Sequence, residues 1–285
     1  MVLSTTPLAP GLYVVATPIG AARDITLRAL DILATADVLA AEDTRNTRRL
    51  MEIHSVSLGG RPLVSYHDHS GPAQREKLLR HIEEGRSVAY VSDAGTPLVA
   101  DPGFALARDA IARGLPVWSA PGPSALLAAL VVSGLPSDRF LFAGFAPTAK
   151  GARAKFLAEL ARVPATLIFF EAPKRVSQMI RECVSVFGGE RRAAVCRELT
   201  KKFEEVKRGT LLELSEAYAD APPKGEIVLL IDRAAEQVSD EDRDAALTAA
   251  LATMSVKDAA RHVAEALDLP RRDVYQAALA MAKAR

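Results

Sequence analysis

Five short segments rich in Gly, Pro, Asp, Ser and Thr follow predicted strands, and they are the part of this chain best suited to chemistry. One or two would be ordinary turns, because these residue types dominate turns for conformational reasons. Five indicate a ligand site, since open α/β sheets bind ligands at the carboxyl ends of their strands. Polar acceptors, close backbone approach at Gly95 and Gly122, and nearby apolar side chains suit a small zwitterionic nucleoside. The segments are residues 16–20 (ATPIG), 41–45 (AEDTR), 92–97 (SDAGTP), 120–124 (APGPS) and 170–173 (FEAP).

The sequence signatures of several other chemistries are missing. No G-x-G-x-x-G follows a strand and no G-x-x-x-x-G-K-[ST] occurs, which argues against a dinucleotide or triphosphate held by the usual loops. H-E-x-x-H and G-x-S-x-G are also missing. Cys183 and Cys196 have no nearby Cys or His partners, so they predict neither a disulfide framework nor a zinc site. We expect both cysteines to be buried, and we expect no metal.

The elements that must position these loops predict an α/β fold. In a first domain, residues 1–137, apolar runs end in turn residues and are followed by helical periodicity, as in a mainly parallel sheet. Asp101 and Pro102 are expected to start the third helix, as N-cap and first-turn residue. The predicted strand and helix pairs are 12–17 with 25–36, 38–41 with 45–53, 88–91 with 104–112, and 117–120 with 124–132.

The pattern changes twice further along the chain. A second αβα domain, residues 138–234, is predicted from strands at 140–142, 166–170, 193–196 and 227–231 and helices at 152–161 and 175–187. Residues 235–285 contain no strand candidate, and apolar residues recur at helical spacing in 242–254, 256–267 and 271–282. This helical tail is either a helix-turn-helix-like nucleic-acid reader or a packing or dimer element.

Composition and charge describe an ordinary globular protein. The chain has 285 residues, 49% of them hydrophobic, and a net charge of +1. Its longest apolar stretch, 125–132, is far shorter than the ~20 residues of a spanning helix, and no signal pattern begins the chain, so we expect a cytoplasmic protein without a membrane partner. Residues 139–210 hold 15 Lys or Arg against 7 Asp or Glu. Such a block either binds a polyanion or is a solvated surface whose acids lie elsewhere in space.

Longer stretches in a fixed order are more specific than any single loop. They are LYVVATPIG, AEDTR, SDAGTP, PGPSA, FFEAPKR and RELTKK. With these motifs and its helical tail, the chain resembles the tetrapyrrole methylase family over nearly its whole length, and within it the branch that methylates ribosomal RNA. The resemblance implies two αβα domains with S-adenosylmethionine in the cleft between them, usually in a homodimer. It also implies a cytidine ribose 2'-oxygen in the decoding region of 16S rRNA as acceptor, in the 30S subunit.

Two other functions remain open at this point. One is an enzyme of the same fold that methylates a tetrapyrrole, a corrin or porphyrin precursor. The other is a non-catalytic rRNA-binding assembly factor, although a pure binder has no need of SDAGTP and PGPSA together.

The resemblance also carries over cofactor-binding positions. Motif residues implied to bind S-adenosylmethionine are Pro18, Asp93, Gly95, Thr96, Ser124 and Ala125. Four more follow from their place relative to strands of the second domain, namely Phe170, Leu199, Gly225 and Glu226. The chain departs from the family pattern at Ala21 and Ala22, where Asn and Leu are usual, so contacts from that turn are in question.

Methyl transfer to a hydroxyl is an in-line displacement in which alignment supplies most of the catalysis, and a base or a cation beside the forming alkoxide helps. Asp43 is a candidate base, and equally a helix N-cap. Glu171 is a second candidate base, and equally a cap of the helix at Pro173. Lys201 is a candidate for stabilising the alkoxide or holding a phosphate, or lies on a solvated face.

Basic and aromatic residues are candidates for contact with RNA. Tyr66 is a candidate for stacking on a base, or a half-buried core residue. His67 helps to place the nucleotide, or is a surface residue. The basic candidates are Arg45, Arg48, Arg49, Arg197, Lys201 and Lys202.

Overall fold

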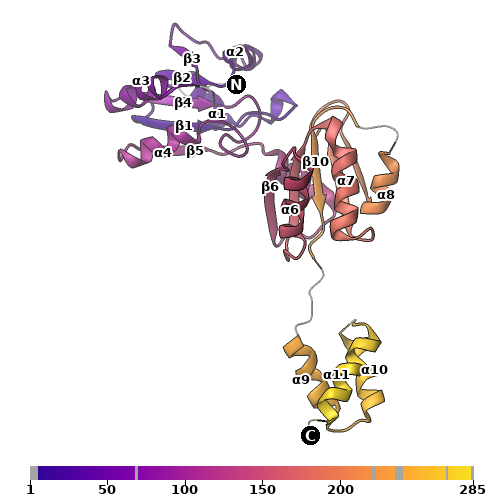
Figure 1. Cartoon of the computed structure of the whole chain (residues 1–285). Coiled ribbons are helices and arrows are strands. Elements are labelled where there is room, and N and C mark those ends of the chain that lie inside the picture. The colour runs from indigo at the N-terminus through magenta and orange to yellow at the C-terminus, as the bar shows by residue number, and fades with distance from the viewer. Residues whose placement is uncertain (1–5, 68–69, 220–222, 235–239, 268, 284–285) are drawn as a thin grey trace. The chain divides into compact units, whose positions relative to one another are not determined.

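The computed structural model describes residues 6–67, 70–219, 223–234, 240–267 and 269–283. By contacts between its residues the chain divides into two compact units, residues 1–233 and 234–285. The first unit contains two five-stranded sheets and the second contains helices (Figure 1). The predicted fold class, α/β with a helical tail, is confirmed. The predicted boundary between residues 137 and 138 stays a prediction.

The first sheet is parallel throughout and has the order β3-β2-β4-β1-β5. Helices α1 and α2 pack in one apolar cluster on one face, and α3 and α4 pack in another cluster on the opposite face. Successive residues of each central strand contribute to opposite clusters, because side chains alternate along a strand. The elements are β1 (Gly11–Val15), η1 (Ala22–Asp24), α1 (Leu27–Thr35), β2 (Val38–Ala41), α2 (Thr44–Ile53), β3 (Leu63–Ser65), α3 (Pro72–Glu83), β4 (Ser87–Val91), α4 (Phe104–Ala112) and β5 (Val117–Ala120).

Strands β1 and β4 form the topological switch point of this sheet. They are neighbours, but β1 leads to α1 on one face and β4 leads to α4 on the other. Chains that leave neighbouring strands toward opposite faces open a crevice at the carboxyl ends, where such sheets bind ligands. The two loops are joined at their base by Thr17 and Gly95, whose N–H groups each donate to the other's carbonyl at 2.9 and 3.0 Å.

The second sheet is mixed, with the order β6-β7-β10-β8-β9. Strands β6 and β7 are parallel, and the other neighbours are antiparallel. Helices α6, α7 and α8 pack on one face, and α5 packs on the other although the chain enters it from the first sheet. The elements are α5 (Ala125–Ser133), β6 (Phe140–Phe145), α6 (Lys150–Leu160), β7 (Thr166–Glu171), α7 (Pro173–Phe187), β8 (Arg192–Arg197), β9 (Glu205–Thr210), α8 (Leu211–Ala217) and β10 (Ile227–Ile231).

The second unit contains α9 (Asp240–Ala250), α10 (Val256–Ala266) and α11 (Arg271–Lys283), which share one apolar cluster. Ser255 caps α10, because its hydroxyl accepts from the backbone N–H of Asp258 at 3.2 Å. Among the described residues, no helix in either unit is long and apolar enough to cross a membrane.

One predicted helix start is wrong. Helix α4 begins at Phe104 after Gly103, which adopts a left-handed conformation with φ 108°, so Asp101 is not its N-cap. A side chain at position 103 would place its Cβ 2.2 Å from the Tyr90 ring. Residues 98–102 therefore form part of the long loop after β4, and this loop is free to line a cavity.

Candidate active site

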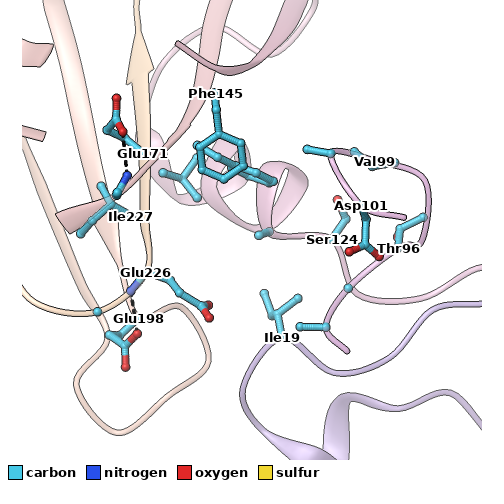
Figure 2. Close-up of a pocket in the computed structure, with 18 of the residues that line it drawn as sticks. Ile19, Thr96, Val99, Asp101, Ser124, Phe145, Glu171, Glu198, Glu226 and Ile227 are labelled. Carbon is cyan, nitrogen blue, oxygen red and sulfur yellow. Dashed lines mark hydrogen bonds between the residues drawn. The ribbon is translucent and has the colours of Figure 1, made fainter. Parts of the chain in front are cut away.

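A cavity of about 660 Å³ lies between the loops of the first sheet and the carboxyl ends of β6 and β7 in the second (Figure 2). This volume is within the range of cavities that hold small molecules. Ile19, Thr96 and Ser124 line it from the first sheet, and Phe145 and Ile227 line it from the second. The site is therefore formed only when both sheets are present.

The cavity collects most of the residues implied to bind the cofactor. Seven of the ten line it: Gly95, Thr96, Ser124, Ala125, Phe170, Gly225 and Glu226. Leu199 is 8% exposed and packs in the apolar cluster beneath α5. Pro18 and Asp93 line a different, smaller cavity. The cofactor roles of all ten residues remain predictions.

Backbone geometry shapes the first-sheet wall of the cavity. Gly95 has φ 79°, a conformation that L side chains rarely adopt, and a Cβ there would lie 3.3 Å from Ile19 Cγ2. The Thr96 hydroxyl donates to the Pro123 carbonyl at 2.9 Å, which ties the two glycine-containing loops together. Ser124 precedes α5, and its hydroxyl makes no capping hydrogen bond to the described part of that helix. This hydroxyl is therefore available to a ligand in the cavity.

Glu171, the last residue of β7, is the most deeply buried charged group that lines the cavity. It is 3% exposed, its Oε1 accepts from the Ala172 N–H at 2.7 Å, and it pairs with the Arg175 guanidinium at 3.2 Å. Burial raises the pKa of the Glu171 carboxyl, against the lowering effect of that N–H and of Arg175. Glu171 Oε2 is buried without a hydrogen-bond partner among the described residues. Because an unpaired buried acceptor is costly, this oxygen favours the protonated form of the carboxyl.

Three charged residues form a network at the cavity wall. Lys201 Nζ lies 3.0 Å from Glu198 Oε1 and 3.0 Å from Glu226 Oε2. Burial alone would lower the pKa of Lys201, but hydrogen bonds to the two carboxylates raise it, so the amine stays charged at neutral pH. A lysine already paired with two carboxylates stabilises a nearby alkoxide less than an unpaired lysine does.

The loop that carries this network is strained and contacts the loop after β1. Glu198 and Thr200 have positive φ values of 49° and 62°, which is uncommon for residues other than Gly. The Thr200 hydroxyl accepts from the backbone N–H of Ala21 at 3.1 Å. A side chain on Gly20 would meet Lys201 and Thr200 within 2.6 Å. The turn at Ala21 and Ala22, where the chain departs from the family pattern, thus contacts the second sheet through its backbone.

Asp43 is the N-cap of α2, one of the two roles expected for it. Its Oδ1 accepts from the Arg45 N–H at 2.8 Å, and its Oδ2 lies 2.5 Å from the Arg45 guanidinium. Hydrogen bonds from Arg45 lower the pKa of Asp43 to about 2. A carboxylate of such low pKa is a weak general base at neutral pH. Asp43 also does not line the larger cavity, so its role as base stays a prediction that the geometry disfavours.

The RNA candidates divide by exposure. Arg48, Arg49, His67 and Lys202 are exposed, and Arg45, though exposed, is bound to Asp43. Tyr66 is a correction: it is 3% exposed and packs edge-on against Tyr90 with ring centroids 5.8 Å apart, so in this structure it is a core residue and cannot stack on a base. Its burial follows from its position directly after β3, at the end of a strand within the sheet.

The basic block at 139–210 is partly neutralised by nearby acids. Arg153 pairs with Glu182, and Arg197 with Glu205 at 2.9 Å. Arg208 donates to main-chain carbonyls at the end of α5. These pairs match the alternative in which the acids lie close in space. Both cysteines are buried and unbridged, as predicted.

Comparisons with known proteins agree with this architecture. The model of the Tetrapyrrole (Corrin/Porphyrin) Methylases matches residues 11–215, and that of the RsmI C-terminal HTH domain matches residues 237–282. The chain is 49% identical to ribosomal RNA small subunit methyltransferase I of Mesorhizobium japonicum, over 95% of this chain and 92% of that protein. It is 44% identical to the protein of that name from Xylella fastidiosa, over 93% and 98%.

A solved structure shares the fold of the first unit. Uroporphyrin-III C-methyl transferase from Thermus thermophilus, complexed with S-adenyl homocysteine, aligns with a TM-score of 0.53 and 23% identity. The alignment covers 77% of this chain and 96% of that one. At this identity the likeness describes the fold alone.

Proposed function

The chain belongs to the tetrapyrrole methylase family, and on this premise we propose that it is an S-adenosylmethionine-dependent methyltransferase of small-subunit ribosomal RNA. The acceptor we propose is the 2'-oxygen of a cytidine ribose in the decoding region of 16S rRNA. The observation that carries the proposal is similarity to rRNA methyltransferases of 44–49% identity over more than nine-tenths of the chain. The C-terminal helices match a domain family of their own, the RsmI C-terminal HTH domain. This match supports an RNA substrate over a tetrapyrrole.

The larger cavity fits the cofactor. Its walls combine backbone turns at Gly95 and Gly225, aromatic rings at Phe145 and Phe170, and carboxylates at Glu198 and Glu226. Carboxylates at the cavity wall suit a cationic amino acid group or a ribose hydroxyl. Bound there, S-adenosylmethionine supplies a methyl group on a positively charged sulfur.

The protein's own residues then have three tasks. The Gly95–Thr96 turn and Ser124 orient the cofactor from the first sheet, because alignment of oxygen, methyl and sulfur dominates this displacement. Phe145 and Phe170 exclude water from the cavity. We propose Glu171 over Asp43 as the base that accepts the hydroxyl proton, because Glu171 is among the residues that line the cavity and burial raises its pKa.

The substrate form, assembly and location are further parts of the proposal. We propose the 30S subunit as substrate and the cytoplasm as location. A homodimer is supported by apolar side chains exposed on α5 and on the edge strand β6. Val131 is 78% exposed, and Leu127, Phe140 and Leu141 are also exposed. Exposed apolar patches of this kind mark protein interfaces, and sedimentation analysis of the full chain tests the assembly.

The decisive test is methyl transfer from labelled S-adenosylmethionine to purified 30S subunits that lack the modification, with mass mapping of the RNA. A methyl group on a decoding-region cytidine 2'-oxygen is the expected result. Cofactor binding without rRNA methylation would reject the acceptor, and tetrapyrroles would be the next substrates to test.

A further inference from the structure

A second, smaller cavity lies against the loops that line the cofactor cavity. It has a volume of about 180 Å³ and is lined by the loop after β1, the loop after β4 and one side of α2. We propose that this cavity receives the nucleobase of the acceptor nucleotide. The inference rests on the proposed function, because it assigns a subsite to the same reaction.

The position of the cavity supports this assignment. Pro18 and Asp93 line the small cavity, while Ile19 and Ala94, the next residue in each loop, line the large one. The two cavities thus share the walls that the Thr17–Gly95 pairing holds together at the switch point. A base held on one side of these loops leaves its ribose beside them, where the methyl donor is expected.

The size and chemistry of the lining match a single base. About 180 Å³ is below the roughly 300–1,000 Å³ of sites for drug-sized ligands, so a tetrapyrrole does not fit. Leu50 and Ile53 of α2 provide apolar surface, and Ile53 is 55% exposed. Asn46 and Arg49 provide donors, and Asp93 provides an acceptor. Enzymes that act on an extruded nucleotide hold its base in this way, by apolar contact and by hydrogen bonds to its edge.

Two side chains in the lining have unused hydrogen-bonding capacity. Thr47 is 3% exposed, and its hydroxyl is buried with no partner among the residues described. Arg49 forms no ion pair or hydrogen bond with the described part of the chain, in contrast to Arg45 in the same helix. A buried hydroxyl without a partner costs free energy in the unliganded protein. A ligand group that forms a hydrogen bond with the Thr47 hydroxyl would remove this cost.

The test uses the full chain, S-adenosylmethionine and unmodified 30S subunits, with KM for 30S, kcat, cofactor affinity and Tm measured for each variant. Arg49→Ala is expected to raise KM about fivefold or more, with cofactor affinity unchanged. Arg28→Ala is the matched control, because Arg28 is an exposed arginine of α1 that lines neither cavity. Thr47→Val is expected to raise KM without lowering Tm, since it removes only a hydroxyl that has no partner in the described part of the chain. Thr47→Ser, which keeps the hydroxyl, is expected to lose less.

The results separate this inference from the proposed function. Suppose that the parent chain methylates 30S, that Arg49→Ala has the same KM for 30S as Arg28→Ala, and that Thr47→Val has the same KM as Thr47→Ser. The subsite is then rejected and the proposed function stands. A weaker cofactor affinity in Arg49→Ala with an unchanged KM for 30S would also reject the subsite. If the parent chain binds cofactor and methylates no rRNA, the proposed function fails and the subsite falls with it.

Discussion

Replacing Gly225 with alanine places a methyl group against the Glu198 side chain. Gly225 has φ 91°, and a Cβ there would lie 2.5 Å from Cγ, Cδ and Oε1 of Glu198. Glu198 cannot move without loss, because its Oε1 accepts from the Glu226 N–H at 2.9 Å and from Lys201 Nζ at 3.0 Å. The substitution therefore strains the backbone and disrupts the network of Glu198, Lys201 and Glu226 at the larger cavity.

The two costs can be estimated separately. A non-glycine residue in the left-handed region costs about 1 kcal/mol or slightly more. Breaking hydrogen bonds to the charged Glu198 carboxylate, whose side chain is 20% exposed, costs about 2 kcal/mol more. The expected loss for Gly225→Ala is about 3 kcal/mol, or about 6–12 °C in Tm for a unit of this size.

The matched control is Gly85→Ala. Gly85 has φ 82°, but a Cβ there would meet nothing within 4 Å, so this variant reports the backbone cost alone, about 2–4 °C. Thermal unfolding and calorimetric titration with S-adenosylmethionine provide the comparison. We expect weaker cofactor binding in Gly225→Ala and unchanged binding in Gly85→Ala. Equal losses of Tm and equal cofactor affinities in the two variants would refute the network as part of the site.

The further predictions concern Glu171, Asp43 and the two cysteines. Glu171→Gln is expected to lower the single-turnover methylation rate about 100-fold or more if Glu171 accepts the proton, and a rate near that of the parent excludes it. Burial raises the pKa of Glu171 in the folded chain, so its stabilising contribution is present below the unfolded pKa and is lost as pH rises through the folded pKa. Over that pH interval the Tm of Glu171→Gln should therefore fall less than the Tm of the parent. Asp43→Asn should stay within a few-fold of the parent rate. Since the folded pKa of Asp43 is lowered to about 2, the parent's stability advantage over Asp43→Asn should be present above the unfolded pKa, about 4, and shrink as pH falls toward 2. Burial raises the pKa of Cys196 to about 12 and that of Cys183 as well, so iodoacetamide at pH 8 should label neither until the chain unfolds; rapid labelling of the folded protein would contradict their burial.

Elements with an apolar signal were predictable from the sequence. Buried strands such as β1, β4 and β10 coincide with the apolar runs at 12–17, 88–91 and 227–231. Strand β9 was missed because it is an edge strand with the sequence EVKRGT, whose side chains are largely exposed. Its pairing with β8 is specified by the neighbouring strand and not by its own pattern.

The loops that line the larger cavity could also be predicted from the sequence, but which of their residues line which cavity could not. Gly95, Thr96 and Ser124 were expected at one site and line one cavity. Asp93 stands two residues before Gly95 in the same motif, yet it lines the smaller cavity and accepts from the Asp43 N–H at 3.0 Å. Asp101 was expected to cap a helix and instead lines the larger cavity.

By itself the sequence determined the class of fold and the loops that carry polar residues, because strand and helix periodicity and turn residues are local signals. Tertiary structure alone decided that β10 lies between β7 and β8, which brings Gly225 and Glu226 to the cavity. It also decided that Glu171 is buried with one oxygen that has no hydrogen-bond partner in the described ranges, and that Lys201 lies between two carboxylates. Burial and charge pairing depend on groups distant in the chain, so the pKa values and free polar groups that determine chemistry follow only from packing.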